Sequence, residues 1–419
     1  MNIDITKFKH KHTCRICNSK DVHKFISLGP TPLANSFLNT KETSQELYFP
    51  LDVYFCNNCY LVQLLDIVNP EEMFKDYAYI TGASSPMTAH FANLASDVHT
   101  NFNKSGLVID IGSNDGTLLL EFAKYGYKTL GVEPSNISKI AEDRGIETIN
   151  TFFDESCANQ IVTKFGKADV ITATNVFAHI DNIESVLKGV DTLLSTTGVF
   201  IIEAPYLPKL IKNVEFDTIY HEHLSYFSLQ PLIYFFNKYG FEVVDVKSIS
   251  SHGGSNRIFV QRLPAIRSEN VKTMLMQEIE DKIYSFNTYL QFANNVELIK
   301  NNLTTLLKIF KSQNLKIVGY GATAKGNTLL NYCKIGPETL DYISDTTPTK
   351  QGTYSPGMHI PIVSEKTFHE DIPDIALLLA WNYADTILIK ENEYIKNDGK
   401  FIIPIPEPKV ITNIRRYKQ

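Results

Sequence analysis

The amino-acid sequence predicts an α/β protein with an N-terminal metal-binding module, a central doubly wound α/β domain and a C-terminal Rossmann-like α/β domain. Two CxxC pairs stand within residues 1–70, and short apolar runs alternate with helix-like segments over residues 71–262. A second alternating series occupies residues 313–419. Such alternation is typical of parallel sheets that are covered by helices on both faces.

The individual strands are expected where short apolar runs end in turn or polar residues. In the central domain these runs occupy residues 107–112, 127–133, 168–175, 198–205, 241–249 and 255–263, and the last two suit an antiparallel edge pair. Residues 270–312 lack proline and glycine, so the connector 263–312 is expected to hold one or two long helices. The C-terminal strands are expected at residues 315–319, 340–345, 374–381 and 400–406.

Composition excludes several classes of protein. The 419 residues are 43% hydrophobic and 21% charged, which indicates a folded chain. A net charge of −6 without a Lys/Arg-rich block argues against a nucleic-acid partner. There is neither a signal-like N-terminus nor a run of about 18 apolar residues, so no membrane association is expected. We therefore expect a cytoplasmic monomer.

The cysteine pairs Cys14/Cys17 and Cys56/Cys59 carry the metal prediction. Each CxxC places two thiolates about one tight turn apart, and two such pairs complete a tetrahedral zinc site. Four thiolates leave no coordination position open, so a structural zinc that holds the loop-rich residues 1–70 together is expected. The alternative is four unrelated buried cysteines.

The segment VIDIGSNDGTLL predicts a cofactor loop in the central domain. A strand ends in Asp110, and a loop containing Gly112 and Asn114 leads into a helix. Ligands of doubly wound sheets bind at this strand end, where glycines let a backbone approach closely. The pattern is not the phosphate fingerprint GxGxxG. An acidic group here suits the cationic amino-acid end of S-adenosylmethionine better than a pyrophosphate.

The next strands supply further cofactor candidates in a fixed order. Glu133 ends the second strand, where a carboxylate can accept both ribose hydroxyls of an adenosine. Phe153 and Asp154 are suited to flank and hydrogen-bond an adenine, and Asn175 ends the fourth strand region. The alternative is an α/β domain that binds a different nucleotide.

The segment FDTIYHEHLSYFS, residues 216–228, crowds Tyr220, Glu222 and His223 into an expected loop. A histidine with a pKa near 6.5 can take a proton at neutral pH, and Tyr and Glu can orient it. His179, at the end of the fourth strand region, is expected to face the same cleft. A metal cluster or a solvated loop are the alternatives.

The C-terminal turn GYGATAKGNT directly follows a strand. Its helix N-terminus, with Thr323, Lys325 and Asn327, predicts an anion site for a substrate diphosphate. No acidic group stands in an obvious ribose position, which disfavours a bound NAD. A purely structural turn is the alternative.

Together with the cysteine pairs, the blocks DIGSNDGTLL, IYHEHLSYFS, SHGGSNR and GYGATAKGNTLLNY resemble the sugar C-methyltransferase family of deoxysugar pathways, typified by TDP-sugar C-3′-methyltransferases. The resemblance covers essentially the whole chain. It implies structural zinc in the first domain, S-adenosylmethionine in the middle domain and a C-terminal domain that serves a nucleotide-diphosphate keto-sugar.

The resemblance also implies roles for individual residues. His223 would remove a sugar proton, with Tyr220, Glu222 and His179 beside it. In the segment DYAYITG, Tyr79 is preferred over Tyr77 as a further active-site tyrosine. The SHGGSNR block adds the substrate-binding candidates His252, Ser255 and Arg257.

The methylation reaction also has a physical rationale that is independent of the resemblance. A carbon next to a ketone loses a proton only if donors stabilise the enolate oxygen, and the methyl donor must lie in line at about 3–3.5 Å. The expected product is a sugar methylated at C-3; methylation at C-5 and an NAD-linked nucleotide-sugar oxidoreductase are alternatives. A non-catalytic zinc-knuckle adaptor would not need two α/β domains. The nucleotide (TDP, GDP or CDP) stays open.

Overall fold

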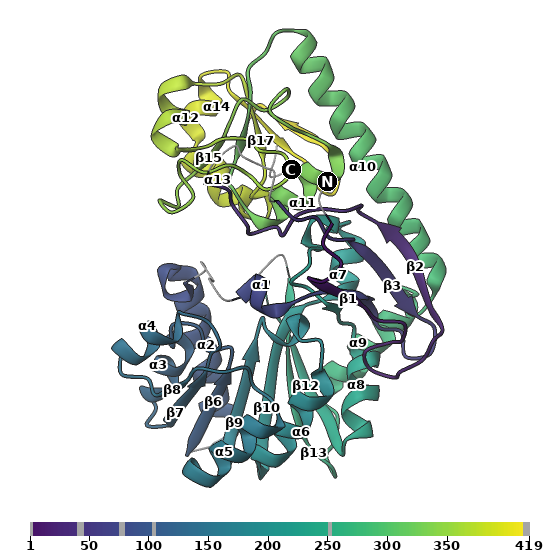
Figure 1. Cartoon of the computed structure of the whole chain (residues 1–419), viewed down its shortest axis with the longest axis vertical. Coiled ribbons are helices and arrows are strands. Elements are labelled where there is room, and N and C mark those ends of the chain that lie inside the picture. Colours follow the sequence, from purple (N-terminus) through teal and green to yellow (C-terminus); the bar gives the residue numbers. More distant parts are fainter. Residues whose placement is uncertain (1–2, 40–45, 75–79, 103–105, 250–253, 414–419) are drawn as a thin grey trace.

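The computed structural model describes residues 3–39, 46–74, 80–102, 106–249 and 254–413. In Figure 1 the C-terminal domain lies at the top and the central domain at the bottom, with the N-terminal module along one side between them. The long helix α10 runs along the outside of that module. Among the described residues, no helix combines the length and apolar character that crossing a bilayer requires.

The N-terminal module is not only loops, because it contains two small sheets. Its elements are β1 (Phe8–His10), β2 (Val22–Ser27), β3 (Asp52–Cys56), β4 (Val62–Leu64), β5 (Asp66–Val68) and α1 (Pro70–Phe74). β1 pairs with β5, while β2, β3 and β4 form an antiparallel sheet. The fourth strand of that sheet is β11 (Ser225–Tyr226), which comes from the histidine-rich segment of the central part.

The central domain is a seven-stranded sheet in the order β12-β13-β10-β9-β6-β7-β8. Its strands are β6 (Leu107–Ile111), β7 (Lys128–Val132), β8 (Thr148–Ile149), β9 (Ala168–Thr174), β10 (Leu194–Pro205), β12 (Phe241–Ile249) and β13 (Ser255–Arg262). All neighbours are parallel except β13, which is antiparallel to both β10 and β12. The expected strands are confirmed, and β12 and β13 form the expected antiparallel pair at one edge of the sheet.

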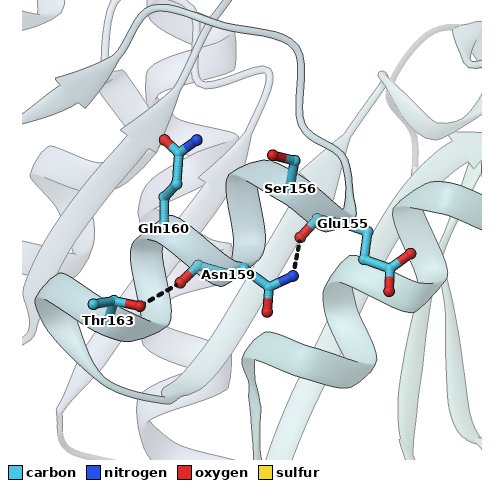
Figure 2. A pocket seen from close by; sticks show the side chains of 5 residues that line it. All are labelled: Glu155, Ser156, Asn159, Gln160 and Thr163. Carbon is cyan, nitrogen blue, oxygen red and sulfur yellow. Dashed lines mark hydrogen bonds between the residues drawn. The ribbon is translucent and has the colours of Figure 1, made fainter.

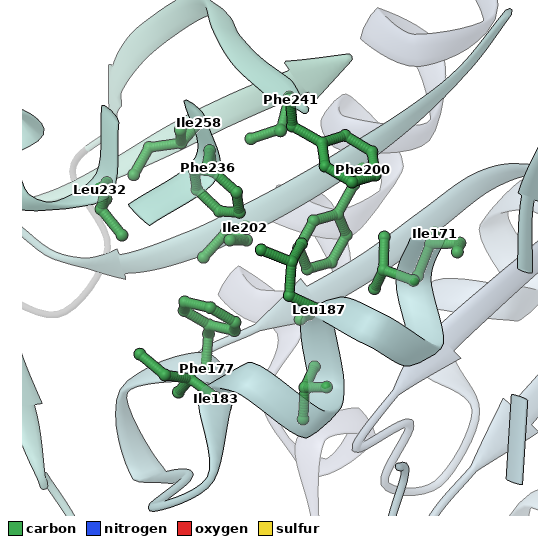
Figure 3. Packing of buried hydrophobic residues seen from close by; sticks show 14 of the residues in the cluster. Ile171, Phe177, Ile183, Leu187, Phe200, Ile202, Leu232, Phe236, Phe241 and Ile258 are labelled. Carbon is green, nitrogen blue, oxygen red and sulfur yellow. The ribbon is translucent and has the colours of Figure 1, made fainter. Parts of the chain in front are cut away.

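Helices cover both faces of this sheet. The helical elements of this part of the chain are η1 (Thr81–Ala83), α2 (Ser85–Phe102), α3 (Thr117–Ala123), α4 (Ser138–Asp143), α5 (Glu155–Phe165), η2 (Phe177–His179), α6 (Ile183–Leu193), α7 (Leu207–Lys212), η3 (Phe216–Thr218) and α8 (Leu229–Lys238), of which α7 and η3 belong to the core shared with the N-terminal module and the C-terminal domain. Adjacent residues of a strand pack on opposite faces of the sheet, in different apolar clusters. Val170 and Ile171 of β9 are an example. On one face Ile171 and Phe200 pack with Leu187 of α6 and Phe236 of α8 (Figure 3). Burial on both faces explains the continuous apolar runs in the sequence.

The connector consists of two helices that serve different domains. α9 (Glu269–Glu280) begins at the N-cap Ser268 and packs on β12. α10 (Phe286–Ser312) packs on the N-terminal module, where the ring centroids of Tyr289 and Phe25 lie 5.1 Å apart.

The C-terminal domain is a six-stranded sheet in the order β16-β15-β14-β17-β18-β19, antiparallel only at β19. Its elements are β14 (Ile317–Tyr320), α11 (Ala324–Cys333), β15 (Ile343–Asp345), β16 (Ile362–Ser364), α12 (Glu365–Asp371), β17 (Ile375–Leu378), η5 (Trp381–Tyr383), α13 (Ala384–Lys390), α14 (Asn392–Lys396), β18 (Lys400–Ile403) and β19 (Lys409–Ile411). This is the Rossmann-like arrangement that the sequence predicts.

Candidate active site and metal centre

The four paired cysteines come together at one point of the N-terminal module. The ligand atoms of Cys14, Cys17, Cys56 and Cys59 all lie within 4.8 Å of one another, and three of the side chains are buried. Both pairs have the same backbone pattern. The amides of Asn18 and Tyr60 donate to the carbonyls of Cys14 and Cys56, at 3.0 and 2.9 Å, and both residues have positive φ.

This donor set fits zinc. Four sulfur atoms at metal–sulfur distances of about 2.3 Å must lie roughly 3.8 Å apart in a tetrahedron. The Sγ atoms of Cys14 and Cys59 are 3.4 Å apart, and those of Cys17 and Cys56 are 3.5 Å apart. Two matching knuckles that present four thiols to one point are poorly explained by unrelated core cysteines.

Most of the predicted cofactor residues lie at the carboxyl ends of β6, β7 and β9, whereas Phe153 and Asp154 follow β8. Asp110 is buried and accepts a hydrogen bond from the hydroxyl of Thr172 at 2.6 Å. Gly112 has a φ of 70°, and a Cβ there would lie 2.4 Å from the side chain of Val176. This glycine is therefore needed for packing against the segment after β9, in addition to any approach to a ligand.

Glu133 ties the neighbouring loops together from the end of β7. One of its carboxylate oxygens accepts the amide of Asn114 and the other accepts the amide of Ser135, both at 2.9 Å. Asn175 follows β9 with a φ of 57°, and its amide donates to the carbonyl of Glu203. The buried Oδ1 of Asn175 finds no hydrogen-bond partner within the described chain. A polar ligand would satisfy it.

The two residues predicted to contact adenine, Phe153 and Asp154, have different structural roles. Phe153 is buried and lies close to Gly189 of α6, whose Cβ would meet the ring at 2.9 Å. Asp154 caps α5 by accepting the amide of Cys157 at 2.8 Å. That carboxylate therefore has a structural partner already, which sequence alone does not reveal.

Carboxylates dominate the electrostatics of this strand edge. Burial raises the pKa of Asp110 to about 7 against the hydrogen bond from Thr172, and the nearby charges of Glu133 and Glu203 raise it further. Repulsion between buried carboxylates favours a cationic ligand at this edge over a phosphate.

We expect Glu133→Gln to weaken the binding of S-adenosylmethionine about 10- to 100-fold, because a neutral amide is a poorer partner for ribose hydroxyls than a carboxylate. Isothermal titration calorimetry measures the change. Glu142→Gln, which removes the same charge from the exposed side of α4, is the matched control. Equal affinities in both variants would contradict the assignment of Glu133.

His223 is held in a defined orientation in the histidine-rich segment. Its Nδ1 lies 2.7 Å from the carbonyl oxygen of Thr218. Since a carbonyl can only accept, Nδ1 carries the proton and the lone pair of the neutral ring is on Nε2. The rings of Tyr220 and His179 lie 4.0 and 5.1 Å from the His223 ring, measured between centroids. Three of the predicted catalytic side chains are therefore together.

His221 and Glu222, the two residues just before His223, contact the N-terminal module instead. His221 is buried beside the carbonyls of Phe49 and Pro50, and burial lowers its pKa to about 4. Glu222 is buried and accepts the side-chain amide of Asn35 at 2.6 Å. Burial raises the pKa of Glu222 to about 7 against that hydrogen bond.

Glu222→Gln is expected to stabilise the protein above pH 7 and not at pH 5. The folded protein holds the Glu222 proton up to about pH 7, whereas an unfolded chain releases it near 4.5. The carboxyl therefore lowers the free energy of unfolding as pH rises through that window, by at most about 3 kcal/mol. Thermal unfolding at pH 5 and pH 8 measures the effect. Glu280→Gln, on the exposed end of α9, should change neither midpoint.

Arg15, between the first two cysteines, was not singled out by its sequence. Its guanidinium is buried and donates to the carbonyl of Leu224 at 2.8 Å and to that of Leu64 at 3.0 Å. It also lies 3.4 Å from the carboxylate of Asp181, two residues after His179. The first cysteine knuckle thus contacts both segments that carry the candidate catalytic histidines.

Some of the predicted site residues lie outside the described residues. They are Tyr77 and Tyr79 of the DYAYITG segment and His252 of the SHGGSNR segment. Ser255 is buried at the start of β13. The buried guanidinium of Arg257 pairs with Glu203 at 2.6 Å and Asp97 at 3.0 Å.

The C-terminal turn uses most of its polar groups within the chain. The Thr323 hydroxyl caps α11 by accepting the amide of Gly326 at 2.9 Å, and the Asn327 side chain donates to the carbonyl of Ala34 at 2.7 Å. Lys325 lies 3.5 Å from Glu215, and its ammonium makes no hydrogen bond to the residues that the structure describes. Of the three candidates, Lys325 therefore keeps the most capacity for an anion.

One sequence inference about this turn is wrong. Asp345 ends β15, the strand beside β14, so an acidic group does stand at the ribose position of a Rossmann unit. Its carboxylate accepts the amide of Ala322 at 2.6 Å and that of Thr347 at 2.7 Å. The amide that a phosphate would use is thus already engaged by this carboxylate.

Two further features do not coincide with the predicted residues. A surface depression on α5 is lined by polar side chains, and those of Asn159 and Thr163 bond to carbonyls of the same helix (Figure 2). Glu365, His369 and Glu391 lie close enough for a metal, but Lys390 pairs with Glu365 and Tyr320 donates to Glu391 at 2.7 Å. The carboxylates of the second feature therefore already have partners within the chain.

Comparisons with known proteins cover all three parts of the chain. Residues 14–74 match a zinc binding domain, residues 88–246 a methyltransferase domain and residues 250–406 a C-methyltransferase C-terminal domain. The C-methyltransferase NovU of Streptomyces niveus is 38% identical over 407 residues, which is 95% of this chain and 96% of that protein.

Solved structures resemble the fold more distantly. A magnesium protoporphyrin IX methyltransferase from Synechocystis, with bound S-adenosylmethionine, is 14% identical with a TM-score of 0.32, covering 47% of this chain and 89% of that one. An S-adenosylmethionine-dependent methyltransferase from Anabaena variabilis is 15% identical with a TM-score of 0.33, covering 44% and 88%. At these TM-scores nothing about function follows from them.

Proposed function

The chain belongs to the S-adenosylmethionine-dependent C-methyltransferases with an N-terminal zinc-binding domain, and from this we propose that it methylates a carbon next to the ketone of a nucleotide-linked 4-keto-deoxysugar. C-3 is the favoured carbon, and C-5, on the other side of the ketone, is the alternative. The observation that carries the proposal is the placement of the Tyr220 and His179 rings against the ring of His223.

His223 is the proposed base. The carbonyl of Thr218 holds the proton on Nδ1, so the lone pair on Nε2 is the one that takes the sugar proton. The C–H electron pair then moves into the C–C bond and the ketone oxygen becomes an enolate. Protonation of Nε2 produces an imidazolium, which the Thr218 carbonyl stabilises through the same hydrogen bond.

Tyr220 and His179 are the proposed donors to the enolate oxygen, because each ring lies against His223. Donors aimed at a developing oxyanion supply a large part of the stabilisation in such steps. S-adenosylmethionine supplies the methyl group as a sulfonium electrophile. The carboxylates at the ends of β6 and β7, and the buried Oδ1 of Asn175, support its placement there.

The proposed substrate contacts extend to the C-terminal domain. Lys325 is proposed to bind the diphosphate, since its ammonium is buried and retains hydrogen-bonding capacity toward a ligand. Ser255 is a second proposed contact. It begins β13 and pairs with Pro205 at the carboxyl end of β10. Arg257 is proposed to act through Glu203 and Asp97, with which it is already paired.

Deuterium exchange tests the proposed chemistry directly. The enzyme is incubated with a TDP-4-keto-6-deoxysugar in deuterium oxide, with S-adenosylhomocysteine in place of the methyl donor. We expect deuterium to enter one carbon next to the ketone, because deprotonation does not need the methyl group. NMR identifies that carbon, and incorporation at C-5 instead of C-3 would replace the favoured position by its alternative. Absence of exchange at both carbons, with methylation intact, would contradict a separate enolate.

A further inference from the structure

The short turn η3 supplies the carbonyl that orients His223. Asp217 and Thr218 are adjacent residues of this turn, and both are buried. Thr218 accepts the Nδ1 proton of His223 through its backbone, so a change of the Thr218 side chain leaves this acceptor in place. What fixes the position of the turn therefore fixes the orientation of the imidazole.

Three contacts from the C-terminal domain hold η3. The indole Nε1 of Trp381 donates to the Oδ2 of Asp217 at 2.6 Å. Phe216 packs edge-on against Tyr332 of α11, with ring centroids 5.3 Å apart. Just before the turn, Glu215 lies 3.5 Å from the ammonium of Lys325.

The contact between Trp381 and Asp217 is the most directional of these. Asp217 has no exposed surface, and burial raises the pKa of its carboxyl to about 6 against the attraction of Lys325. The Lys325 ammonium also lies 5.1 Å from the centroid of the Trp381 ring. A buried carboxylate that loses its donor has little water with which to replace it, so the turn should shift rather than leave the group unpaired.

We propose that Trp381 and Asp217 are positioning residues, through which the C-terminal domain holds the Thr218 carbonyl on Nδ1 of His223. The proposal rests on the proposed role of His223 as the base. It gives the C-terminal domain a part in proton transfer besides its part in substrate binding. Neither residue touches the reacting atoms.

Trp381→Phe tests the proposal, because it keeps an aromatic ring beside Lys325 and removes the indole N–H together with the five-membered ring that carries it. We expect kcat for methylation and the rate of deuterium exchange to fall together, about 10- to 100-fold. KM for the sugar nucleotide and the affinity for S-adenosylmethionine should change less than about twofold. The acid limb of the kcat profile should move to lower pH, because His223 loses an acceptor that stabilises its imidazolium.

A double-mutant cycle and an NMR measurement separate positioning from a loss of folding. Asp217→Ala alone, Trp381→Phe alone and both together should lower kcat to similar extents, because each change removes one side of the same hydrogen bond. In protein labelled with ¹⁵N-histidine, Trp381→Phe should reduce the share of the Nδ1–H tautomer of His223. Tyr383→Phe, on the exposed side of the same turn η5, is the matched control and should behave as wild type.

Three outcomes would overturn the proposal: an unchanged kcat, a rise in KM alone, or additive effects in the cycle. These outcomes are distinguishable from a failure of the proposed function. If His223→Asn keeps full exchange activity, the base itself is wrongly assigned. If His223→Asn abolishes exchange and Trp381→Phe has the kcat and pH profile of wild type, only the positioning role is wrong.

Discussion

His223→Asn is expected to lower kcat for methyl transfer about 10²- to 10⁴-fold, the usual contribution of a general base. Asparagine can still donate to the Thr218 carbonyl through its amide, so the local shape should survive while the basic nitrogen is lost. Binding of S-adenosylmethionine and of the sugar nucleotide should stay within about threefold of wild type, as calorimetry can measure.

Deuterium exchange into the substrate should disappear in the same variant, because proton removal is the step that it loses. His99→Asn, which changes an exposed histidine of α2, should leave both activities intact. A His223→Asn enzyme that still exchanges but no longer methylates would move the base to another group, with His179 and Tyr220 as the next candidates.

Cys56→Ser is expected to remove the zinc and with it both stability and activity. Structural zinc sites in small domains contribute about 10–16 kcal/mol of apparent binding energy, and that energy is coupled to folding. Even a partial loss of this energy should strongly lower the temperature of the first thermal unfolding transition. Elemental analysis should find less than one zinc per chain, and activity should fall because Arg15 no longer holds Leu224 beside His223.

Cys333→Ser is the control that distinguishes the effect of losing zinc from the general effect of replacing a buried thiol. Cys333 lies in the C-terminal domain and is buried as Cys56 is, but it stands apart from the four clustered cysteines. It should keep one zinc per chain and full activity. Normal zinc content and stability in Cys56→Ser would show that these four cysteines do not form the metal site.

The sequence predicted the parts of the fold that depend on local periodicity. Strand β6 is buried along its whole length and β9 nearly so, and such strands appear as continuous apolar runs. The paired CxxC spacing is equally local, so the cluster of four cysteines could be predicted without knowing the module around it. The two connector helices follow from the absence of proline and glycine.

Contacts between distant segments escaped prediction because no local pattern encodes them. The pairing of β11 with β4 joins residues that are far apart in the chain, and β11 is only two residues long. The acceptor of the His223 proton is a backbone carbonyl, which any residue could supply. Asp345 was overlooked because its position beside the glycine turn depends on the strand order.

The position of β11 also limits how this protein can be recombined with its relatives. Ser225 pairs with Gln63 of the N-terminal module, and Arg15 of that module donates to the carbonyl of Leu224. A graft of residues 71–262 alone would bring in a histidine-rich segment while leaving its supporting strand and arginine behind. Chimeric enzymes with new substrate preferences should therefore be cut so that residues 8–68 and 207–226 always come from the same parent.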